Sequence, residues 1–576
     1  MRQRAIVLNL IVCVVAFVAA PVLAAPMYSS GAGGPYVWDN ATTPVWSAAS
    51  GGPYTSTFGG YNDAVFEGAG AAVTVAGVNA NSMTFTADGY VLSGGTITLG
   101  SPSGGPGVTV DAGLTAVIHA PLSRAGSGQP YMTKRGDGLL VLDGAGSTAQ
   151  GLAAYQGTLE IAGGSLAVAN DLYVGGTTFQ GVDSSLGTLL VSNGALTVNG
   201  ANFLLGQTVN GTAQVSQFTQ TGGTVNHTGG WLALANGGGT SQMDISGGTF
   251  TTASALNIGI RGSGEVNVSG TGVLNVNGIN TGHSASGAAR TTDITISDSA
   301  ALHVTGGNII LANQAGASTQ FTQTGGSFTF GGGGYFYMGN MGAPTQSVDI
   351  TGGTFAASNT GATYLAVRGT ASFTVGGDAE VSLRELGIGH GSTSGSTGIV
   401  NLDGGRLTLG RIFENSGGHH GIVNFNGGVL RASASNSAFL TGLDAANIQA
   451  GGAVIDTQNY QITVGQALLG GAGDGGLVKD GTGDLFLTAA NTYTGGTTVN
   501  AGRLILQGSG NLGSGSVIVN PGGELFAATG VTLNNAFSIS GDGNNGLDTQ
   551  PRGALRLESN SVIGRASCRE RVYHPV

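Results

Sequence analysis

Residues 244–250 read Asp-Ile-Ser-Gly-Gly-Thr-Phe, and residues 349–355 read Asp-Ile-Thr-Gly-Gly-Thr-Phe. In both copies a polar residue and two glycines separate short stretches in which apolar and polar residues alternate. A period of two is typical of β-strands, and glycine supplies the positive φ that a sharp corner needs. The phrase therefore predicts two short strands joined by a tight turn.

The same phrase recurs from about residue 163 to residue 431, with neighbouring copies about 23 to 28 residues apart, which is a solenoid period. Several short repeats together form a longer duplication, since residues 218–223 and residues 321–326 both read Phe-Thr-Gln-Thr-Gly-Gly. We expect an all-β fold, an elongated parallel β-helix whose coils stack at about 4.8 Å. An array of β-sandwiches is the alternative. Further copies of the phrase begin at Thr221, Thr324, Asp403 and Asn426.

Composition supports a packed chain that is poor in helix. Of the 576 residues, 109 are Gly and 9% are charged, and the mean hydropathy is +0.19. Such a chain is too apolar to be disordered and too rich in Gly for long helices. Its net charge of −11 disfavours nucleic acid as a partner. Cys13 and Cys568 lie near the two ends, so the body of the chain has no disulfide or Cys-based metal site.

The first residues predict export. Arg2 and Arg4 precede an apolar run, Ala5 to Ala20, and small residues then allow cleavage after Ala24. Residues 1–24 are therefore expected to be a signal peptide, with an anchoring transmembrane helix as the less favoured interpretation.

The remaining chain divides by composition. We expect an N-terminal cap and first strands over residues 25–130, closed by Trp38 and Trp46, and Gly-rich coils over 131–440. Residues 441–562 are expected to continue the coils. Residues 563–576 turn abruptly basic and resemble a translated sequencing adapter, so we expect a non-native tail and a natural chain that continues beyond Val562.

A second motif stands near each end of the coil region. Residues 476–488 read GLVKDGTGDLFLT, followed by NTYTGGT at 491–497, and residues 131–142 read YMTKRGDGLLVL. These stretches resemble the autotransporter-associated β-strand repeat, also called the passenger-associated transport repeat. The first copy along the chain departs from the family by lacking the Asn-Thr-Tyr phrase.

The resemblance implies a right-handed parallel β-helical passenger on the surface of a Gram-negative cell. In that family, either a C-terminal outer-membrane barrel exports the passenger or a short hydrophobic tail sorts it. Contact with the outer membrane is accordingly expected only through a missing C-terminal region.

Lys134 and Lys479 are the only lysines of the sequence, and both occupy the same place in this motif. We expect a structural role, in which the stem of each lysine covers apolar strand surface and its ammonium reaches a nearby carboxylate.

A polysaccharide lyase or hydrolase on a β-helix is the enzymatic alternative. Glu380, Arg384 and Glu385 form the densest charged cluster in the coils, but no second cluster is evident one coil away. Acidic and Arg side chains repeated on adjacent coils would favour this alternative. The Gly-Asp-Ser-Gly phrase of serine-protease autotransporters is absent. We therefore expect no catalytic residue and no enzyme activity.

Three weaker patterns favour structural interpretations. His419 and His420 follow His390 by about one coil, which permits a metal site but supplies no carboxylate at a fixed spacing. Residues 470–474 are similar to a calcium-binding Gly-Asp phrase without its repeats, and residues 135–137 form an Arg-Gly-Asp tripeptide inside the strand motif. We expect no metal and no cofactor.

The function expected from these patterns is that of a non-enzymatic secreted or surface-displayed module, structural or adhesive. Surface glycans or ligands on host or neighbouring cells are the candidate partners. A ligand face rich in exposed aromatic side chains would distinguish an adhesin from an inert stalk. The candidates for such a face are Trp231, Tyr335, Phe336 and Tyr337, for which burial in the core is an equal alternative.

Overall fold

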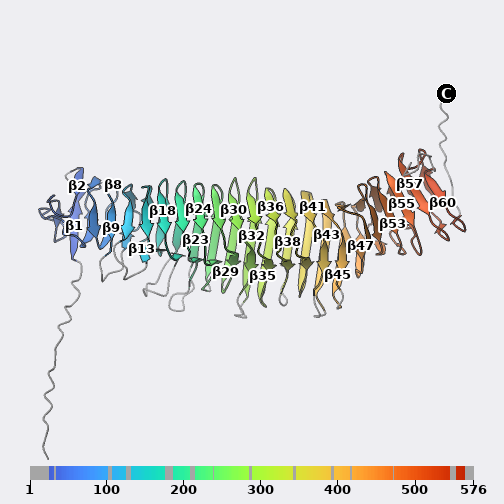
Figure 1. Ribbon diagram of the computed structural model, residues 1–576, viewed down its shortest axis with the longest axis horizontal. Coiled ribbons are helices and arrows are strands. Elements are labelled where there is room, and N and C mark those ends of the chain that lie inside the picture. Colours follow the sequence, from blue (N-terminus) through green and yellow to red (C-terminus); the bar gives the residue numbers. More distant parts are fainter. Residues whose placement is uncertain are drawn as a thin grey trace, which may run out of the picture.

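The computed structural model is an elongated rod built from stacked coils. Its N-terminal coils lie at one end, and its C-terminal coils lie at the other and are tilted relative to the rest (Figure 1). It contains no α-helix among the residues that it describes. The predicted signal peptide and residues 565–576 lie outside them. The structure describes residues 25–564 except 32–33, 101–106, 125–130, 176–185, 201, 208–214, 238, 284–288, 341–345, 391–394, 416–417, 471–472 and 545–552.

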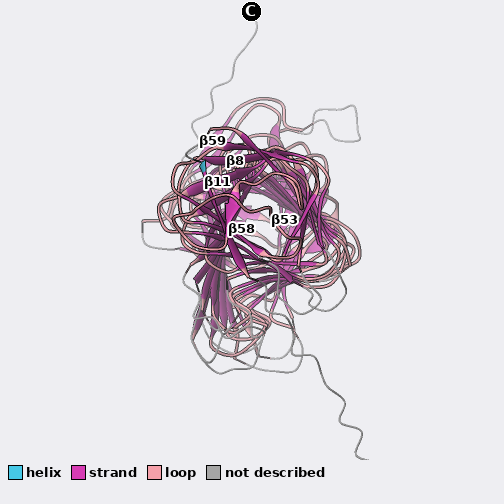
Figure 2. Cartoon of the chain, turned by 90° about the vertical axis from the view of Figure 1, so that its left-hand side faces the viewer, coloured by secondary structure: helices cyan, strands magenta, loops and turns pink. Residues whose placement is uncertain are grey.

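Each coil in the middle of the rod contributes one strand to each of three faces. In one coil, β25 (Leu232–Leu234) lies on face 1, β26 (Thr240–Ile245) on face 2 and β27 (Thr249–Thr252) on face 3. The next coil begins with β28 (Leu256–Ile258), which pairs with β25 in parallel. Figure 2 shows these strands surrounding the axis of the rod. The fold is the predicted parallel β-helix, and parallel pairing between successive coils rules out the array of β-sandwiches.

The core is a set of columns in which equivalent residues of successive coils stack on one another. Along β26, Ser241, Met243 and Ile245 point inward while Gln242 and Asp244 point outward, as the period of two requires. One column on face 2 joins Phe218, Met243, Val266, Ile294 and Phe321, all of them buried. Burial of such columns is the main source of stability in a fold without disulfides.

Coil length separates two kinds of coil. The column just described advances at intervals of about 25 residues, the predicted solenoid period. On face 1, Met132 pairs with Leu152 and Leu152 with Leu172, at a shorter interval of about 20 residues. Near the other end, Leu485 pairs with Leu504 at a similarly short interval. Both Lys-containing motifs lie in short coils, and short coils also occur near the N-terminus, where Ala64 pairs with Met83.

The Gly-Gly corner joins face 2 to face 3. Gly223 and Gly248 have positive φ, and a Cβ atom on Gly248 would collide with the carbonyl of Gly223 in the coil below. The buried side chain of Gln220 donates from Nε2 to the carbonyls of Gly222 and Gly223, and it also donates to Thr249 of the next coil at 3.2 Å. Glycine is needed here because stacked corners leave no room for a side chain.

An aromatic cluster closes the N-terminal end of the core. Trp38 and Trp46 are fully buried, and their ring centroids lie 5.5 Å apart. Phe58 and Phe66 pack against both indoles. The strand that carries Trp46, β3 (Trp46–Ser47), pairs antiparallel with β1 (Pro26–Ser30). An antiparallel strand and large rings thus lie at the first coil, where the sequence predicts a cap.

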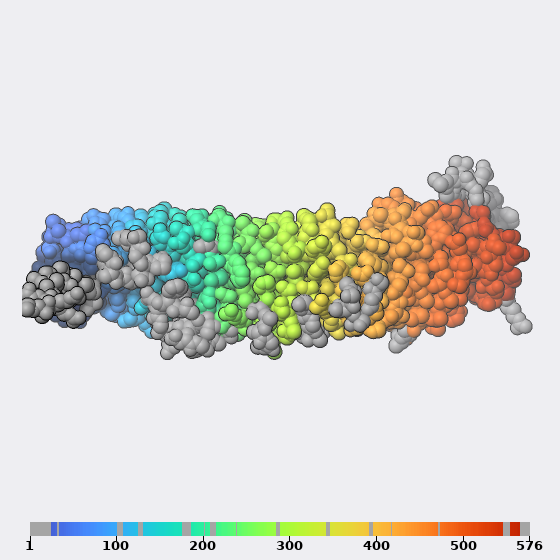
Figure 3. Space-filling view, turned by 60° about the horizontal axis from the view of Figure 1, so that its bottom comes forward, coloured from blue at the N-terminus to red at the C-terminus, as the bar shows by residue number. Residues whose placement is uncertain are grey.

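The outer surface of the rod is continuous from one end to the other (Figure 3). Among the described residues, no helix has the length and apolar character needed to span a bilayer. At the C-terminal end, Ile563 pairs with Leu533, and Gly564 donates from its backbone N–H to Leu533.

Candidate functional site

A column of aromatic side chains runs along the outside of face 1. Tyr337 in β37 (Phe336–Met338) is in register with Tyr364 in β40 (Thr363–Leu365). The column continues through Gly387 in β42 (Leu386–Ile388) to Phe413 in β44 (Ile412–Glu414). Three of these four consecutive coils therefore present rings, and the fourth presents a glycine among them.

Gly387 lets two of these rings converge. A Cβ atom on Gly387 would lie 2.5 Å from Cε1 of Tyr364 and 3.0 Å from Cζ of Phe413. The two ring centroids are 6.4 Å apart across the glycine. A larger residue at position 387 would push the rings apart and break the column.

His390 and Tyr335 extend the column sideways. The His390 ring lies 4.5 Å from Tyr364 and 5.6 Å from Tyr337. Tyr335 stacks on Tyr337 at 5.3 Å and is 47% exposed. We name Tyr335, Tyr337, Tyr364, His390 and Phe413 the aromatic strip.

Two arginines at the edge of the aromatic strip share one carboxylate. Glu385 accepts hydrogen bonds from Arg384 at 2.9 Å and from Arg411 at 2.8 Å. The Arg411 guanidinium also lies 4.1 Å from the centre of the Phe413 ring. Partial burial, and then the charge of Glu385, raise the pKa of Tyr364, so this phenol stays neutral at physiological pH.

The predicted aromatic candidates are divided by the structure. Tyr335 and Trp231 are exposed, and Tyr337 is half-buried within the strip. Phe336 is 2% exposed and belongs to the core, so the burial alternative holds for this residue. Tyr364, His390 and Phe413 were missed as partners of these residues. Tyr364 stands one coil and Phe413 three coils after Tyr337, and this spacing in whole coils is the signal that could have located them.

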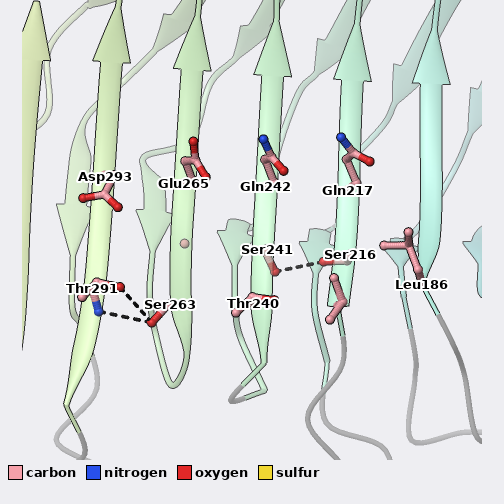
Figure 4. A pocket seen from close by; sticks show the side chains of 12 residues that line it. Leu186, Ser216, Gln217, Thr240, Ser241, Gln242, Ser263, Glu265, Thr291 and Asp293 are labelled. Atoms are coloured by element: carbon pink, nitrogen blue, oxygen red, sulfur yellow. Dashed lines mark hydrogen bonds between the residues drawn. The ribbon is translucent and has the colours of Figure 1, made fainter.

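A polar groove of about 390 Å³ lies on face 2. Gln217, Gln242, Glu265 and Asp293 form one row across four neighbouring strands, β23 (Val215–Gln220), β26, β29 (Ser263–Val268) and β32 (Arg290–Ile296) (Figure 4). The lining residues are Leu186, Val215, Ser216, Gln217, Thr240, Ser241, Gln242, Ser263, Gly264, Glu265, Thr291 and Asp293.

Two carboxylates are neighbours in that row. Glu265 and Asp293 are in register on adjacent coils. Burial, and then the charge of Glu265, raise the pKa of the Asp293 carboxyl. Asn267 donates to Glu265 at 2.7 Å, whereas no described residue donates a hydrogen bond to the Asp293 side chain. The pair was not predicted, because a whole coil of sequence separates the two carboxylates.

The Glu380 cluster does have a partner one coil away, so the expectation of an isolated cluster is wrong. Arg406 is in register with Glu380 and forms an ion pair with it. Arg411 pairs in the same way with Glu385. Because an Arg side chain pairs with each of these carboxylates, the cluster is a set of bridges between coils and offers no pair of facing carboxylates.

The three histidines considered as a metal site lie apart in the structure. The His419 ring is buried, and its Nδ1 lies 2.7 Å from the Ser396 hydroxyl. His420 contacts Asp444 at 2.6 Å, whereas His390 belongs to the aromatic strip. Among the described residues, no three His, Cys, Asp or Glu side chains are grouped so that they could hold a metal ion.

The Asp474 carboxylate holds a corner of the coil above it. Its Oδ2 atom accepts from the backbone and hydroxyl of Thr494 at 2.5 and 2.8 Å, and Oδ1 accepts from the backbone of Gly495. Partial burial is the largest single influence on the pKa of Asp474 and raises it, but these hydrogen bonds together lower the pKa below its usual value. Both carboxylate oxygens are thus engaged by the chain itself.

Both lysines lie inside the fold and not at its surface. The Lys479 ammonium donates to the carbonyls of Asp480, Gly481 and Ala501 at 2.9, 2.7 and 2.9 Å, and to the Thr457 hydroxyl at 3.0 Å. Lys479 is 0% exposed, and burial lowers its pKa to about 8. The expected contact with a carboxylate is wrong, because carbonyls of the corner take that place.

Lys134 repeats this geometry. Its ammonium donates to the carbonyls of Arg135, Gly136 and Gln156 at 3.0, 2.6 and 2.9 Å. Its pKa is also lowered to about 8, again by burial. The Arg-Gly-Asp tripeptide is therefore part of a lysine-filled corner, in which the Gly136 carbonyl is bound.

The two lysine corners stand at different edges of the β-helix. Lys134 joins β13 (Tyr131–Arg135) on face 1 to β14 (Leu139–Leu142) on face 2. Lys479 joins β52 (Leu477–Asp480) on face 3 to β53 (Asp484–Leu487) on face 1. The motif is thus a local corner that can be placed at more than one edge.

These corners and the fold define a parallel β-helical repeat protein. The model of the passenger-associated-transport-repeat family matches residues 132–168 and 477–506. The matched segments contain Lys134 and Lys479 and lie in short coils. The chain therefore carries two segments that match the passenger-associated transport repeat, as its motifs predicted.

One stretch of the chain is similar to a known adhesin. Over 147 residues it is 31% identical to the adhesin BmaC autotransporter of Brucella suis biovar 1 (strain 1330). The match covers 25% of this chain and 3% of that protein. No solved structure matches the chain.

Proposed function

We propose that the protein is a non-enzymatic adhesive passenger, exported and displayed on the surface of a Gram-negative cell. The aromatic strip is the observation that carries an adhesive role over that of an inert stalk. Rings that stand half-exposed on a rigid sheet can stack on a ligand without prior ordering. The two transport repeats and the similarity to an autotransporter adhesin support display.

Display and adhesion can be tested together on intact cells. A strain that carries the gene should bind antibody raised against residues 25–564 and lose the signal after brief external protease treatment. A deletion strain should adhere less to glycan-coated surfaces, and the gene should restore adhesion. Antibody access only after lysis, or equal adhesion of both strains, would contradict the proposal.

A second candidate is a glycan-active enzyme that uses the groove on face 2, the alternative raised from the sequence. Glu265 and Asp293 favour it, because a carboxyl with a raised pKa beside a second acidic side chain suits acid–base work on a glycosidic bond. Release of reducing ends from polysaccharides by the purified protein would support it. That activity should disappear in Asp293→Asn and Glu265→Gln, while Gln242→Asn in the same row should retain it.

A further inference from the structure

The longer duplication of the sequence also duplicates a surface feature. Trp231 directly precedes β25 and Tyr335 directly precedes β37, both on face 1. The backbone N–H of Trp231 donates to Oδ1 of Asn202, and that of Tyr335 donates to Oδ1 of Asn308, both at 2.9 Å. An asparagine of the previous coil thus fixes both aromatic residues in the same way.

Each of these aromatic residues also belongs to a patch with a histidine two coils further on. His283 follows β31 (Ile279–Thr281), and its ring lies 6.3 Å from that of Trp231. His390 follows β42, and its ring lies 5.6 Å from that of Tyr337, on which Tyr335 stacks. We name Trp231 and His283 the first patch and keep the aromatic strip as the second.

The two patches face the same way at a fixed separation. Between Trp231 and Tyr335, face 1 advances from β25 through β28, β31 and β34 (Ile309–Leu311) to β37 in unbroken parallel pairing. Four coils at about 4.8 Å place the patches about 19 Å apart along the rod. A single extended ligand can therefore touch both.

The chemistry of the patches favours ring stacking over ion pairing with the ligand. Trp231 is 51% exposed, so its indole presents an open apolar face and a polar N–H edge. The charges beside the second patch are paired with one another through Glu385. The ring centroids of Tyr337 and Tyr364 lie 6.1 Å apart and those of Tyr364 and Phe413 lie 6.4 Å apart, so neighbouring sugar units of an extended glycan can each meet a ring.

We propose that the two patches are equivalent subsites for one extended neutral glycan with equatorial linkages, lying along face 1. Such a glycan exposes flat C–H faces that stack on rings, while its hydroxyl groups suit the imidazole and indole nitrogens. Each patch alone binds weakly, and a chain that spans both gains by multivalency. The inference rests on the proposed adhesive function and names its ligand class.

Two β-1,4-glucan probes of different length distinguish binding to a single patch from binding that spans both patches. Cellotriose is too short to reach both patches, so calorimetry should find two weak, similar sites per protein. Trp231→Ala and Tyr364→Ala should each reduce that number to one. Hydroxyethylcellulose spans both patches, and each variant should weaken its binding by about 10-fold or more.

Phe486→Ala is the matched control, because Phe486 is a half-buried outward ring on face 1 outside the duplicated region. It should bind both probes as the unaltered protein does, and circular dichroism should show that every variant is folded. High salt should leave binding unchanged. Failure of the unaltered protein to bind either probe, a single cellotriose site, or binding of acidic alginate alone would overturn the proposal.

Adhesion of cells and binding of glucan by the protein can be measured separately. If the Trp231→Ala, Tyr364→Ala double variant loses glucan binding but its cells still adhere, adhesion uses another surface. If cells that carry the unaltered protein do not adhere although glucan binds, the adhesive role is wrong and the two subsites stand.

Discussion

In both the transport-repeat coils and the Gly-Gly coils, a buried side chain donates hydrogen bonds to the backbone carbonyls of a corner. The donor is a lysine in the first kind of coil and a glutamine in the second. In the repeats, a buried lysine donates to two carbonyls of its own turn and one of the next coil, as Lys479 does for Asp480, Gly481 and Ala501. In the Gly-Gly coils, the buried amide of Gln323 donates to its own turn and to Thr354 of the next coil.

The comparison shows that the corner needs a buried hydrogen-bond donor for its carbonyls, and that the donor need not be a lysine. Carbonyls that point into a corner lose water and need a donor, whether that donor is charged or neutral. An ammonium supplies three donors on a flexible stem, but burial disfavours its charge. The amide supplies two donors without that penalty. The lysine occurs in the short coils and the glutamine in the longer ones.

The largest loss of stability is expected when a corner glycine is replaced by alanine, which tests whether both kinds of corner exclude a Cβ atom. Gly502 and Gly353 both have positive φ, and a Cβ on either would collide with a carbonyl of the coil below. Gly502→Ala and Gly353→Ala should each lower local stability by about 4 kcal/mol, through a strained φ and a clash. Hydrogen exchange of the neighbouring strands measures this.

The control is Gly508, which also has positive φ but no atom within 4 Å of the position that an alanine Cβ would occupy. Gly508→Ala should cost about 1 kcal/mol, from φ alone. Equal losses for Gly502→Ala and Gly508→Ala would show that close stacking does not limit the corner.

Removal of the ammonium should have the next largest effect. Lys479→Met keeps the apolar stem but leaves the carbonyls of Asp480, Gly481 and Ala501 without their donor. We expect a loss of about 3 kcal/mol, the balance between unsatisfied carbonyls and relief from a buried charge. Faster hydrogen exchange confined to β52, β53 and the coils beside them would bear this out, and unchanged exchange would contradict it.

Removal of the neutral glutamine donor should lower the stability by less than removal of the lysine. Gln323→Leu removes the hydrogen bonds to Gly326 and Thr354 and should cost about 2 kcal/mol. Gln320→Leu is the control, because Gln320 is exposed on the outer side of the same strand. A loss for Gln323→Leu as large as that for Lys479→Met would remove the distinction between the two kinds of corner.

The smallest effect depends on pH. Because burial lowers the pKa of Lys479 to about 8 from 10.5, the folded chain releases this proton before the unfolded chain does. Stability should therefore rise between pH 8 and 9.5, by about 1 kcal/mol for this residue. The urea midpoint of the unaltered protein should increase relative to that of Lys479→Met, and a constant difference would contradict the assignment.

Much of the architecture could be predicted from local patterns. The period of two, the Gly-Gly phrase and its spacing indicated stacked strands with tight corners, and the Lys-x-Gly-x-Gly motif identified the transport repeat. Trp38 and Trp46 indicated a cap because two large rings precede the first repeats. These signals are local, so each can be seen within one coil of sequence.

The surface could be predicted only in part. The sequence drew attention to Trp231, Tyr335 and Phe336 but left exposure and burial open for each. Neighbouring residues of a strand face opposite ways, and the structure buries Phe336 while it exposes Tyr335. The position of each lysine was predicted, whereas its depth was not. A stem that could lie along the surface or fill the interior looks the same in sequence.

The sequence by itself determined the coil, the corner and the repeat, because strand alternation and turn chemistry act over a few residues. Only the tertiary structure decided which outward residues meet. The coils differ in length, so register, not sequence distance, brings Tyr364 beside His390 and Glu265 beside Asp293. Stacking at a fixed spacing converts such irregular intervals into columns, and the columns form the surfaces that can bind.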